Sequence, residues 1–246
     1  GSLTDGDVRR ALIQGVNLET KVDDIIQNHP KFIRKDSQDI KEIIEFREND
    51  IGIIPILDEH DHIVNIINFR KLRSYLPLDV VIMAGGKGSR LRPLTENVPK
   101  PLLKIGDKPI IEQNIDRLSS YGISNFWISI NYLGEQIENY FKNGKNKDIN
   151  IDYVKEDEPL GTIGAVSKIG KFMHNTVLVT NSDILTNLDY EDFYLNFLES
   201  NADMAVMTIA FKVDIPYAVM EINNGNINAF REKPTYTYYS NGGIYL

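Results

Sequence analysis

The stretch from Asp79 to Thr95 reads DVVIMAGGKGSRLRPLT, and it decides the fold that we expect. Residues 79–84 have the pattern of a buried strand, and a glycine-rich loop follows at once. Glycines in this position let backbone N–H groups approach a ligand closely, which suits phosphate oxygens. The candidates are Gly85, Gly86 and Gly88. The alternative is a glycine-rich turn whose basic residues are simply solvated.

Strand and helix patterns alternate after this loop. Strands are expected at 126–130, 149–154 and 177–179, and helices at 136–141, 163–169 and 190–198. Further strands are expected at 205–211, 218–222 and 227–230. Such alternation predicts an α/β domain, Rossmann-like, with a mostly parallel mixed sheet and helices on both faces.

The residues before the loop form a separate block of short elements. Helices are expected at 8–13 and 40–48, strands at 52–57 and 63–69, and another helix beginning at 71–73. The joint is expected near Tyr75–Pro77. We therefore predict a small α+β domain at 1–77 and a larger domain at 78–246.

The loop matches neither of two common phosphate-binding patterns. The third glycine of G-x-G-x-x-G is replaced by Leu91, and no Lys-Ser or Lys-Thr follows Gly88 as a P-loop requires. Ten residues after Arg90, Lys100 stands between Pro99 and Pro101. Because the second proline disfavours helix at Lys100, we expect a cation on rigid extended backbone, which suits a polyphosphate.

The two segments together carry a family resemblance. The pattern G-G-x-G-x-R-L-x-P-L-T, followed by P-K-P-L-L-x-I-x-x-K-P-I-I-E, resembles the sugar-1-phosphate nucleotidyltransferases, the pyrophosphorylases that make nucleotide sugars. The resemblance covers about residues 79–246 and implies their nucleotidyltransferase fold. A member would serve nucleotide-sugar and polysaccharide biosynthesis.

Four later segments extend the resemblance. Residues 153–162 resemble the nucleobase loop, in which Gly161 would let the backbone lie against the base. The strand ending in Asn181-Ser182-Asp183 resembles the one whose aspartate holds Mg²⁺. It is closer to the mannose-1-phosphate guanylyltransferase branch than to the thymidylyl branch. Residues 230–234 resemble the sugar-phosphate segment, and 241–245 resemble the strand that contacts the sugar.

The family reaction suits these residues. A sugar 1-phosphate attacks the α-phosphorus of a nucleoside triphosphate and pyrophosphate leaves; the nucleophile is already an anion near neutral pH, so cations and a metal are needed rather than a base. The resemblance implies catalytic roles for Arg90, Lys100 and Asp183, with Asp183 binding Mg²⁺. It also implies that Lys233 holds the sugar phosphate, while Glu232 and Asn241 contact the sugar. The alternatives are a loop-capping Asp183 and a solvated turn at 232–233.

The nucleotide is indicated by Glu156, which stands where pyrimidine-using members often carry Gln. A carboxylate accepts from guanine N1–H and N2–H₂ together, whereas uracil and thymine also need a donor. GTP is therefore favoured, with dTTP or UTP as the alternative, unless Glu156 is merely a solvated residue of an acidic run. The sugar stays open among mannose, glucosamine and heptose 1-phosphates.

The family usually supplies a second metal carboxylate from a later strand. The chain ends at Leu246, before that strand. We therefore expect a fragment of a longer protein that binds metal weakly and has little turnover.

The first block resembles the end of one CBS repeat followed by a second repeat from about residue 30 to 76. CBS pairs often bind adenosine nucleotides through a Thr-x-x-Asp spacing, which here corresponds to Thr4 and Asp7. The second repeat has Asn68-Phe69-Arg70-Lys71 in that place and lacks both residue types. A packing or dimerisation module is the alternative to an adenosine nucleotide site.

Composition narrows the class of protein. The 246 residues carry 27 Lys+Arg against 35 Asp+Glu, a net charge of −8, which argues against nucleic acid or an anionic membrane as partners. There is no Cys, which fits a cytoplasmic protein without disulfides, although an exported protein is the alternative. We expect a homo-oligomeric enzyme. The competing hypothesis is a non-catalytic nucleotide sensor, which should lack one of Arg90, Lys100 and Asp183.

Overall fold

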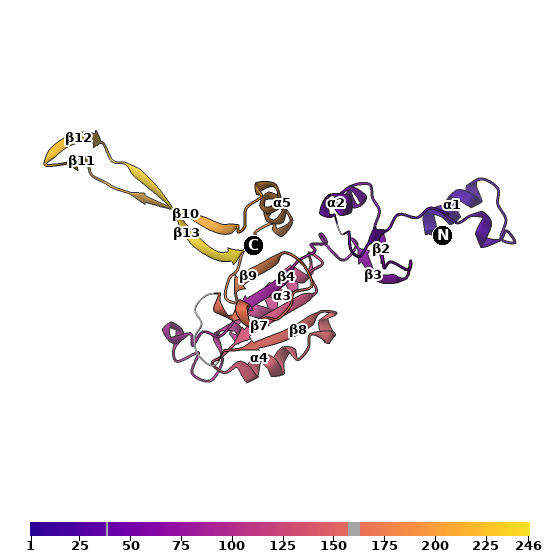
Figure 1. Ribbon diagram of the computed structural model, residues 1–246, viewed down its shortest axis with the longest axis horizontal. Helices are drawn as coiled ribbons and strands as arrows, with labels where there is room; N and C mark the ends of the chain where they lie inside the picture. The colour runs from indigo at the N-terminus through magenta and orange to yellow at the C-terminus, as the bar shows by residue number, and fades with distance from the viewer. Residues whose placement is uncertain (38, 157–162) are drawn as a thin grey trace. The chain divides into compact units, whose positions relative to one another are not determined.

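The computed structural model describes residues 1–37, 39–156 and 163–246. They form two compact units, Gly1–Tyr75 and Leu76–Leu246, each described by itself below (Figure 1). None of the helices in these residues is long and apolar enough to cross a membrane.

The first unit begins with helix α1 (Asp5–Ile13), whose start is fixed by a capping box. The Thr4 hydroxyl accepts from the Asp7 amide at 3.3 Å, and the Asp7 carboxylate accepts from the Thr4 amide at 2.8 Å. The two side chains also bond to each other at 2.6 Å. The Thr-x-x-Asp spacing therefore has a local structural role here.

The rest of this unit packs helix α2 (Ile40–Glu48) with the sheet β1-β2-β3. The strands are β1 (Ile33–Arg34), β2 (Ile53–Leu57) and β3 (Ile63–Asn68), with β1 parallel to β2 and β3 antiparallel to it. Their core consists of Ile33, Ile43, Phe46, Ile54, Ile56 and Ile67.

The helix expected from 71–73 is absent from the described residues. The amides of Lys71 and Leu72 both donate to the Asn68 carbonyl, and the Asn68 side chain accepts from the Arg70 amide. This side-chain bond holds a turn in place of a helix. Helix α1, in contrast, covers the predicted range 8–13 and begins three residues earlier.

The second unit is built on a six-stranded sheet in the order β10-β13-β9-β4-β7-β8. Strand β4 is parallel to β7 and β9, and β7 is parallel to β8, which confirms the predicted α/β fold with a mixed, mostly parallel sheet. The bounds are β4 (Asp79–Met83), β7 (Asn125–Ile130), β8 (Asn150–Lys155), β9 (Val177–Asn181), β10 (Val206–Asp214) and β13 (Thr235–Tyr245).

Strand β4 lies at the centre, and Val80, Val81 and Ile82 are fully buried. A strand flanked by parallel neighbours has no solvated face, which explains its unbroken apolar run. Asp79 is the exception. It is also fully buried, and its carboxylate accepts from the amides of Met173 and His174 at 2.6 and 2.9 Å and lies 3.0 Å from His174 Nδ1.

Among the described residues of this unit, the α-helices are α3 (Ile110–Ser119), α4 (Gly134–Phe141) and α5 (Tyr190–Ser200). The helix expected at 163–169 is a short 3₁₀ segment, η5 (Gly164–Lys168). Glycine at its first position and again at 170 disfavours a longer helix. Other short elements are η1 (Val22–Asp24) in the first unit, and η2 (Ser89–Leu91), η3 (Lys100–Leu102), η4 (Lys145–Lys147), β5 (Lys104–Ile105) and β6 (Lys108–Pro109) in the second.

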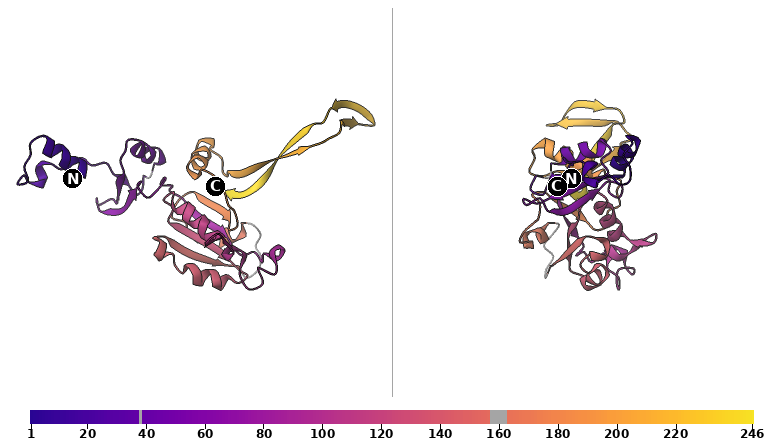
Figure 2. Two further views of the ribbon diagram at one scale, coloured as in Figure 1. Left: turned by 180° about the vertical axis from the view of Figure 1, so that it is seen from behind. Right: turned by 90° about the vertical axis from the view of Figure 1, so that its right-hand side faces the viewer.

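Strands β10 and β13 form a long antiparallel ribbon (Figures 1 and 2). Only Ile244 and Tyr245 of β13 also pair with β9. The residues between β10 and β13 contain a second antiparallel pair, β11 (Val219–Asn223) with β12 (Asn226–Arg231).

Candidate functional site

A pocket of about 840 Å³ lies where the parallel strands of the second unit end. Its wall contains the residues that directly follow four neighbouring strands: Ala84 to Gly88 after β4, Asn131 after β7, Glu156 after β8 and Ser182-Asp183 after β9. The chain leaves β4 toward β7 and β8 on one side and returns to β9 on the other. Ligands of open α/β sheets bind at such a switch point, outside the carboxyl ends of the strands.

The glycine-rich loop needs its third glycine. Gly88 has φ +59°, and a methyl group there would lie 3.0 Å from Thr95 Cγ2 and 3.1 Å from Lys100 Cβ. Thr95 is fully buried, and its hydroxyl donates to the Gly88 carbonyl at 2.9 Å. The loop is thereby anchored, while Arg90 in η2 is exposed at the pocket.

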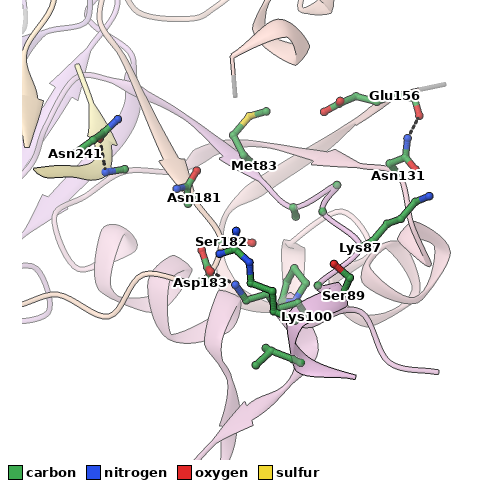
Figure 3. Close-up of a pocket in the computed structure, with 18 of the residues that line it drawn as sticks. Met83, Lys87, Ser89, Lys100, Asn131, Glu156, Asn181, Ser182, Asp183 and Asn241 are labelled. Carbon is green, nitrogen blue, oxygen red and sulfur yellow. Dashed lines mark hydrogen bonds and ion pairs between the residues drawn. The ribbon is translucent and has the colours of Figure 1, made fainter. Parts of the chain in front are cut away.

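Lys100 and Asp183 form an ion pair in this pocket (Figure 3). Lys100 is the first residue of η3 rather than part of an extended segment, which corrects the expectation from its two flanking prolines. Pro99 and Pro101 are both buried and fix the backbone on either side of it. The side chains of Lys100 and Asp183 are 37% and 34% exposed, so solutes can reach both.

The segment that carries Asp183 is held from two directions. The Ser182 amide donates to the Met83 carbonyl at 3.1 Å, which continues the β4–β9 pairing beyond the end of β9. From α3, the Asn114 side-chain amide donates to the Ser182 carbonyl at 3.1 Å. Asp183 therefore lies at a fixed place beside the loop after β4.

Glu156 lies in another part of the pocket, beside Asn131 (Figure 3). It is buried, with 9% of its surface exposed. The Ser129 hydroxyl donates to Glu156 Oε1, and Asn131 Nδ2 donates to the Glu156 carbonyl at 2.6 Å. Glu156 is thus a positioned acceptor rather than a solvated member of an acidic run.

The end of β13 also lines the pocket. Gly243 has φ +76°, and a methyl group there would lie 2.6 Å from Asn181 Nδ2, so β13 approaches β9 closely only because residue 243 is glycine. Asn241 Oδ1 accepts from the Gly243 amide at 2.8 Å, and Asn241 Nδ2 donates to the Tyr245 hydroxyl at 2.8 Å. Asn241 therefore has an internal role at the pocket edge.

The structure brings most of the predicted site residues to this pocket: Gly85, Gly86, Gly88, Arg90, Lys100, Glu156, Asp183 and Asn241. Glu232 and Lys233 do not line it. They are exposed and follow β12, nine and eight residues along the chain from Asn241. The part of β13 from Thr235 to Asn241 alone is about 20 Å of extended strand. Gly161 lies outside the described residues. Thr4 and Asp7 belong to the other unit.

Sequence reasoning missed Lys87, Ser129 and Asn131. Lys87 lies inside the quoted loop, and Asn131 follows β7, so the rule on strand ends could have found both. Ser129 carries no motif signal, because a single serine in an apolar strand is compatible with many environments.

Asp183 is the sequence-predicted metal residue, and its carboxylate lies in the pocket. The described residues hold no group of three or more His, Cys, Asp or Glu side chains that could cage an ion. Mg²⁺ commonly binds through one or two carboxylates together with substrate phosphates. One reachable carboxylate beside a phosphate-suited loop fits that mode.

Comparison with known proteins gives consistent matches. Residues 79–246 match the family model described as nucleotidyl transferase. The chain is 34% identical over 180 residues to mannose-1-phosphate guanylyltransferase 1 of Arabidopsis thaliana, covering 69% of this chain and 49% of that protein. It is 32% identical over 171 residues to D-glycero-alpha-D-manno-heptose 1-phosphate guanylyltransferase of Aneurinibacillus thermoaerophilus, covering 69% and 74%.

Among solved structures, a Bacillus anthracis protein proposed to be a glucose-1-phosphate thymidylyltransferase superposes with a TM-score of 0.53. It is 26% identical, and the match covers 68% of this chain and 70% of that one. The chain thus spans about half the length of the plant relative and more of the bacterial ones. The names of these proteins include both guanylyl and thymidylyl transfer.

Proposed function

The chain belongs to the nucleotidyl transferase family, and we propose that it transfers a nucleoside monophosphate from a nucleoside triphosphate to a sugar 1-phosphate, releasing pyrophosphate. One observation carries this proposal. A single pocket holds the glycine-rich loop, two cations and a carboxylate beside a separate, buried base-reading candidate: Arg90, Lys100, Asp183 and Glu156.

The arrangement suits an in-line displacement. An oxygen of the sugar phosphate bonds to the α-phosphorus, the bond from that phosphorus to the bridging oxygen breaks, and pyrophosphate leaves with the bonding electrons. The nucleophile is already an anion, so the protein must neutralise and align charge rather than remove a proton. We assign the β- and γ-phosphates to the loop amides and Arg90, and the α-phosphate to Lys100.

Asp183 is the residue that would hold a divalent cation, for which we propose Mg²⁺. Bound there, the ion would supply charge neutralisation on the phosphates. Lys100 lies against Asp183, so a nucleotide phosphate can take over Lys100 while the carboxylate turns to the ion.

For the nucleotide we propose GTP. The Glu156 carboxylate accepts from the Ser129 hydroxyl, and it can also accept from two adjacent donors of a guanine edge. The guanylyltransferase names of two relatives support this choice. UTP and dTTP are the alternatives, and the sugar is to be found by screening mannose, glucosamine and heptose 1-phosphates.

The test is pyrophosphate release from each triphosphate with each sugar 1-phosphate and Mg²⁺. Arg90→Ala and Lys100→Met should each lower turnover at least 100-fold, since an oriented charge contact to the transition state is worth about 3 kcal/mol. Arg92→Ala and Lys104→Met are matched controls, because both side chains are exposed and outside the pocket lining. Near-normal rates in the first pair would refute the assignment. A sensor, in contrast, would bind nucleotide without turnover even when a later strand that carries a second metal carboxylate is present.

For the first unit we propose a CBS-type module. A parallel β1–β2 pair, an antiparallel β2–β3 pair and α2 support this proposal. Calorimetric titration with ATP, AMP and adenosine tests for an adenosine nucleotide. Because Thr4 and Asp7 already bond to each other, binding through them requires opening the capping box, and Thr4→Ala should then change the affinity.

A further inference from the structure

Ser129 is a buried hydroxyl in an otherwise apolar part of β7. Its exposed surface is 0%, and that of its neighbours Ile128 and Ile130 is 0% and 3%. A hydroxyl taken out of water costs free energy unless it is hydrogen-bonded. Its partner is Glu156 Oε1, from the residue that directly follows the next strand of the sheet, β8. The cost of burying this hydroxyl is therefore offset by a contact to the residue assigned to the base.

The Glu156 backbone is also held by β7. Its amide donates to the Ile130 carbonyl at 3.0 Å, and its carbonyl accepts from Asn131 Nδ2 at 2.6 Å. These two bonds fix the main chain at the point where β8 ends. They leave the carboxylate to be oriented by what its oxygens contact.

The loop after β4 passes next to this contact. A methyl group on Gly85 would lie 3.3 Å from Asn131 Cβ and 3.6 Å from Glu156 Oε1. Gly85, in the loop that we assign to phosphate binding, therefore lies close to the Glu156 oxygen that Ser129 contacts. The carboxylate plane is set within a packed layer and not at a free surface.

From this geometry we propose that Ser129 is a positioning residue for nucleotide specificity. By donating to Oε1, it fixes the plane of the Glu156 carboxylate, so that the glutamate presents acceptors to a base edge with two adjacent donors, as guanine has. A carboxylate has about four lone-pair sites, so one bond from Ser129 is compatible with accepting two from the base. This inference rests on the proposed function, in which Glu156 reads the base.

The test measures the ratio of GTP to UTP affinity by titration calorimetry, with Mg²⁺, for the wild type and for Ser129→Ala. We expect Ser129→Ala to lower the ratio roughly 3- to 10-fold, the worth of one hydrogen bond, through weaker GTP binding. The affinity for inorganic tripolyphosphate should be unchanged, because the Ser129 hydroxyl donates to Glu156 and not to the residues that we assign to the phosphates.

Two further variants separate positioning from general damage. Ser119→Ala is a matched control, because it removes another buried hydroxyl, one without a hydrogen-bond partner among the described residues. It should leave the ratio unchanged. In a Glu156→Ala background, Ser129→Ala should no longer change the ratio, since Ser129 acts through the carboxylate.

The outcomes are distinguishable. The role of Ser129 would be overturned by an unchanged ratio in Ser129→Ala, or by an equal change of the ratio in the Glu156→Ala background. In that case a shifted ratio in Glu156→Gln would still support Glu156 as the residue that reads the base. If Glu156→Gln leaves the ratio unchanged, or if the chain binds no triphosphate, the proposed function fails and this inference with it.

Discussion

Lys147 joins two acidic side chains of α3 and offers the sharpest test of the energetics of the second unit. Its Nζ lies 2.7 Å from both Glu112 Oε1 and Asp116 Oδ1. Tyr140 of α4 donates to Glu112 Oε2 at 2.6 Å, and Lys108 lies 2.6 Å from Asp116 Oδ2. Replacement by methionine keeps the apolar stem and removes the charge.

The magnitude follows from the exposure of the three side chains, which is 21% for Lys147, 11% for Glu112 and 34% for Asp116. Removing one partner of a fully buried ion pair costs about 3–5 kcal/mol, whereas exposed pairs are worth about 0–1. Partial solvent screening puts Lys147→Met near 2 kcal/mol. The substitution also leaves the carboxylates of Glu112 and Asp116, one helical turn apart, with less positive charge to offset their repulsion. The expected fall in the melting temperature is about 4–8 °C.

The pKa shifts of these three groups predict how the stabilising effect of Lys147 changes with pH. Burial acts to raise the pKa of both carboxyls, but hydrogen bonds from Lys147 and Tyr140 to Glu112, and from Lys108 and Lys147 to Asp116, outweigh it and lower both pKa values. Burial acts to lower the pKa of Lys147, and its two carboxylate partners outweigh that effect and raise it.

Lowered carboxyl pKa values stabilise the fold above the unfolded values, near pH 4, and that contribution is lost as the pH falls through the folded ones. The raised lysine pKa stabilises the fold below its unfolded value, near pH 10.4, and that contribution is lost only as the pH rises through the folded one. The difference between wild type and Lys147→Met should therefore be constant near neutral pH and shrink below about pH 4.

Urea unfolding followed by tryptophan fluorescence measures this difference. Trp127 is the one tryptophan of the sequence, lies in β7 and packs edge-on against Phe172, so the signal reports on the second unit. Lys145→Met is the matched control, since Lys145 is exposed and no ion pair of the described residues includes it. An unchanged midpoint for Lys147→Met, or a difference that persists undiminished at pH 3, would refute the reasoning.

Three other perturbations test contacts elsewhere in the two units. Asp79→Ala leaves two buried amides without their acceptor and should cost about 3 kcal/mol in urea unfolding, whereas a loss under 1 would contradict the geometry. Gly88→Ala places a methyl group at a positive φ and against Thr95, so it should lower both the unfolding midpoint and the affinity for tripolyphosphate. Gly86→Ala, whose methyl group has no heavy atom within 4 Å, should leave the unfolding midpoint unchanged. Thr4→Ala removes a cap and should speed amide exchange in α1, corresponding to about 1 kcal/mol; unchanged exchange would show that the cap does not limit fraying.

The fold of the second unit was predictable because its signals are local. The apolar run at Val80–Ile82 marks a central parallel strand, and alternating helices and strands mark its neighbours. Two helix predictions were wrong for local reasons as well. At Lys71 the preceding asparagine bonds the backbone in a turn, and at Gly164 a helix would begin and end next to glycine. The hydrophobic periodicity on which both predictions rest registers neither the side-chain bond nor the glycines.

The residues of the candidate site were likewise predictable only where their signal is local. Residues of the glycine-rich loop and Lys100 were identified from contiguous sequence, whereas contacts made across strands were not. Ser129 and Glu156 are 27 residues apart, and nothing in their spacing shows that β7 and β8 bring them into contact. Glu232 and Lys233 show the converse, since a motif named them but the β10–β13 ribbon places them beyond the pocket lining.

The pairing of Lys100 with Asp183 was also invisible in the sequence, and it bears on how the proposed reaction begins. In the free site the two charges neutralise each other. A nucleotide phosphate that binds Lys100 releases Asp183, and a cation that binds Asp183 releases Lys100. Since either event breaks the same ion pair, each one removes a cost that the other would otherwise meet, and the two bindings are positively coupled. On the proposed function, a site poor in metal ligands can thereby still hold its ion once the nucleotide is bound.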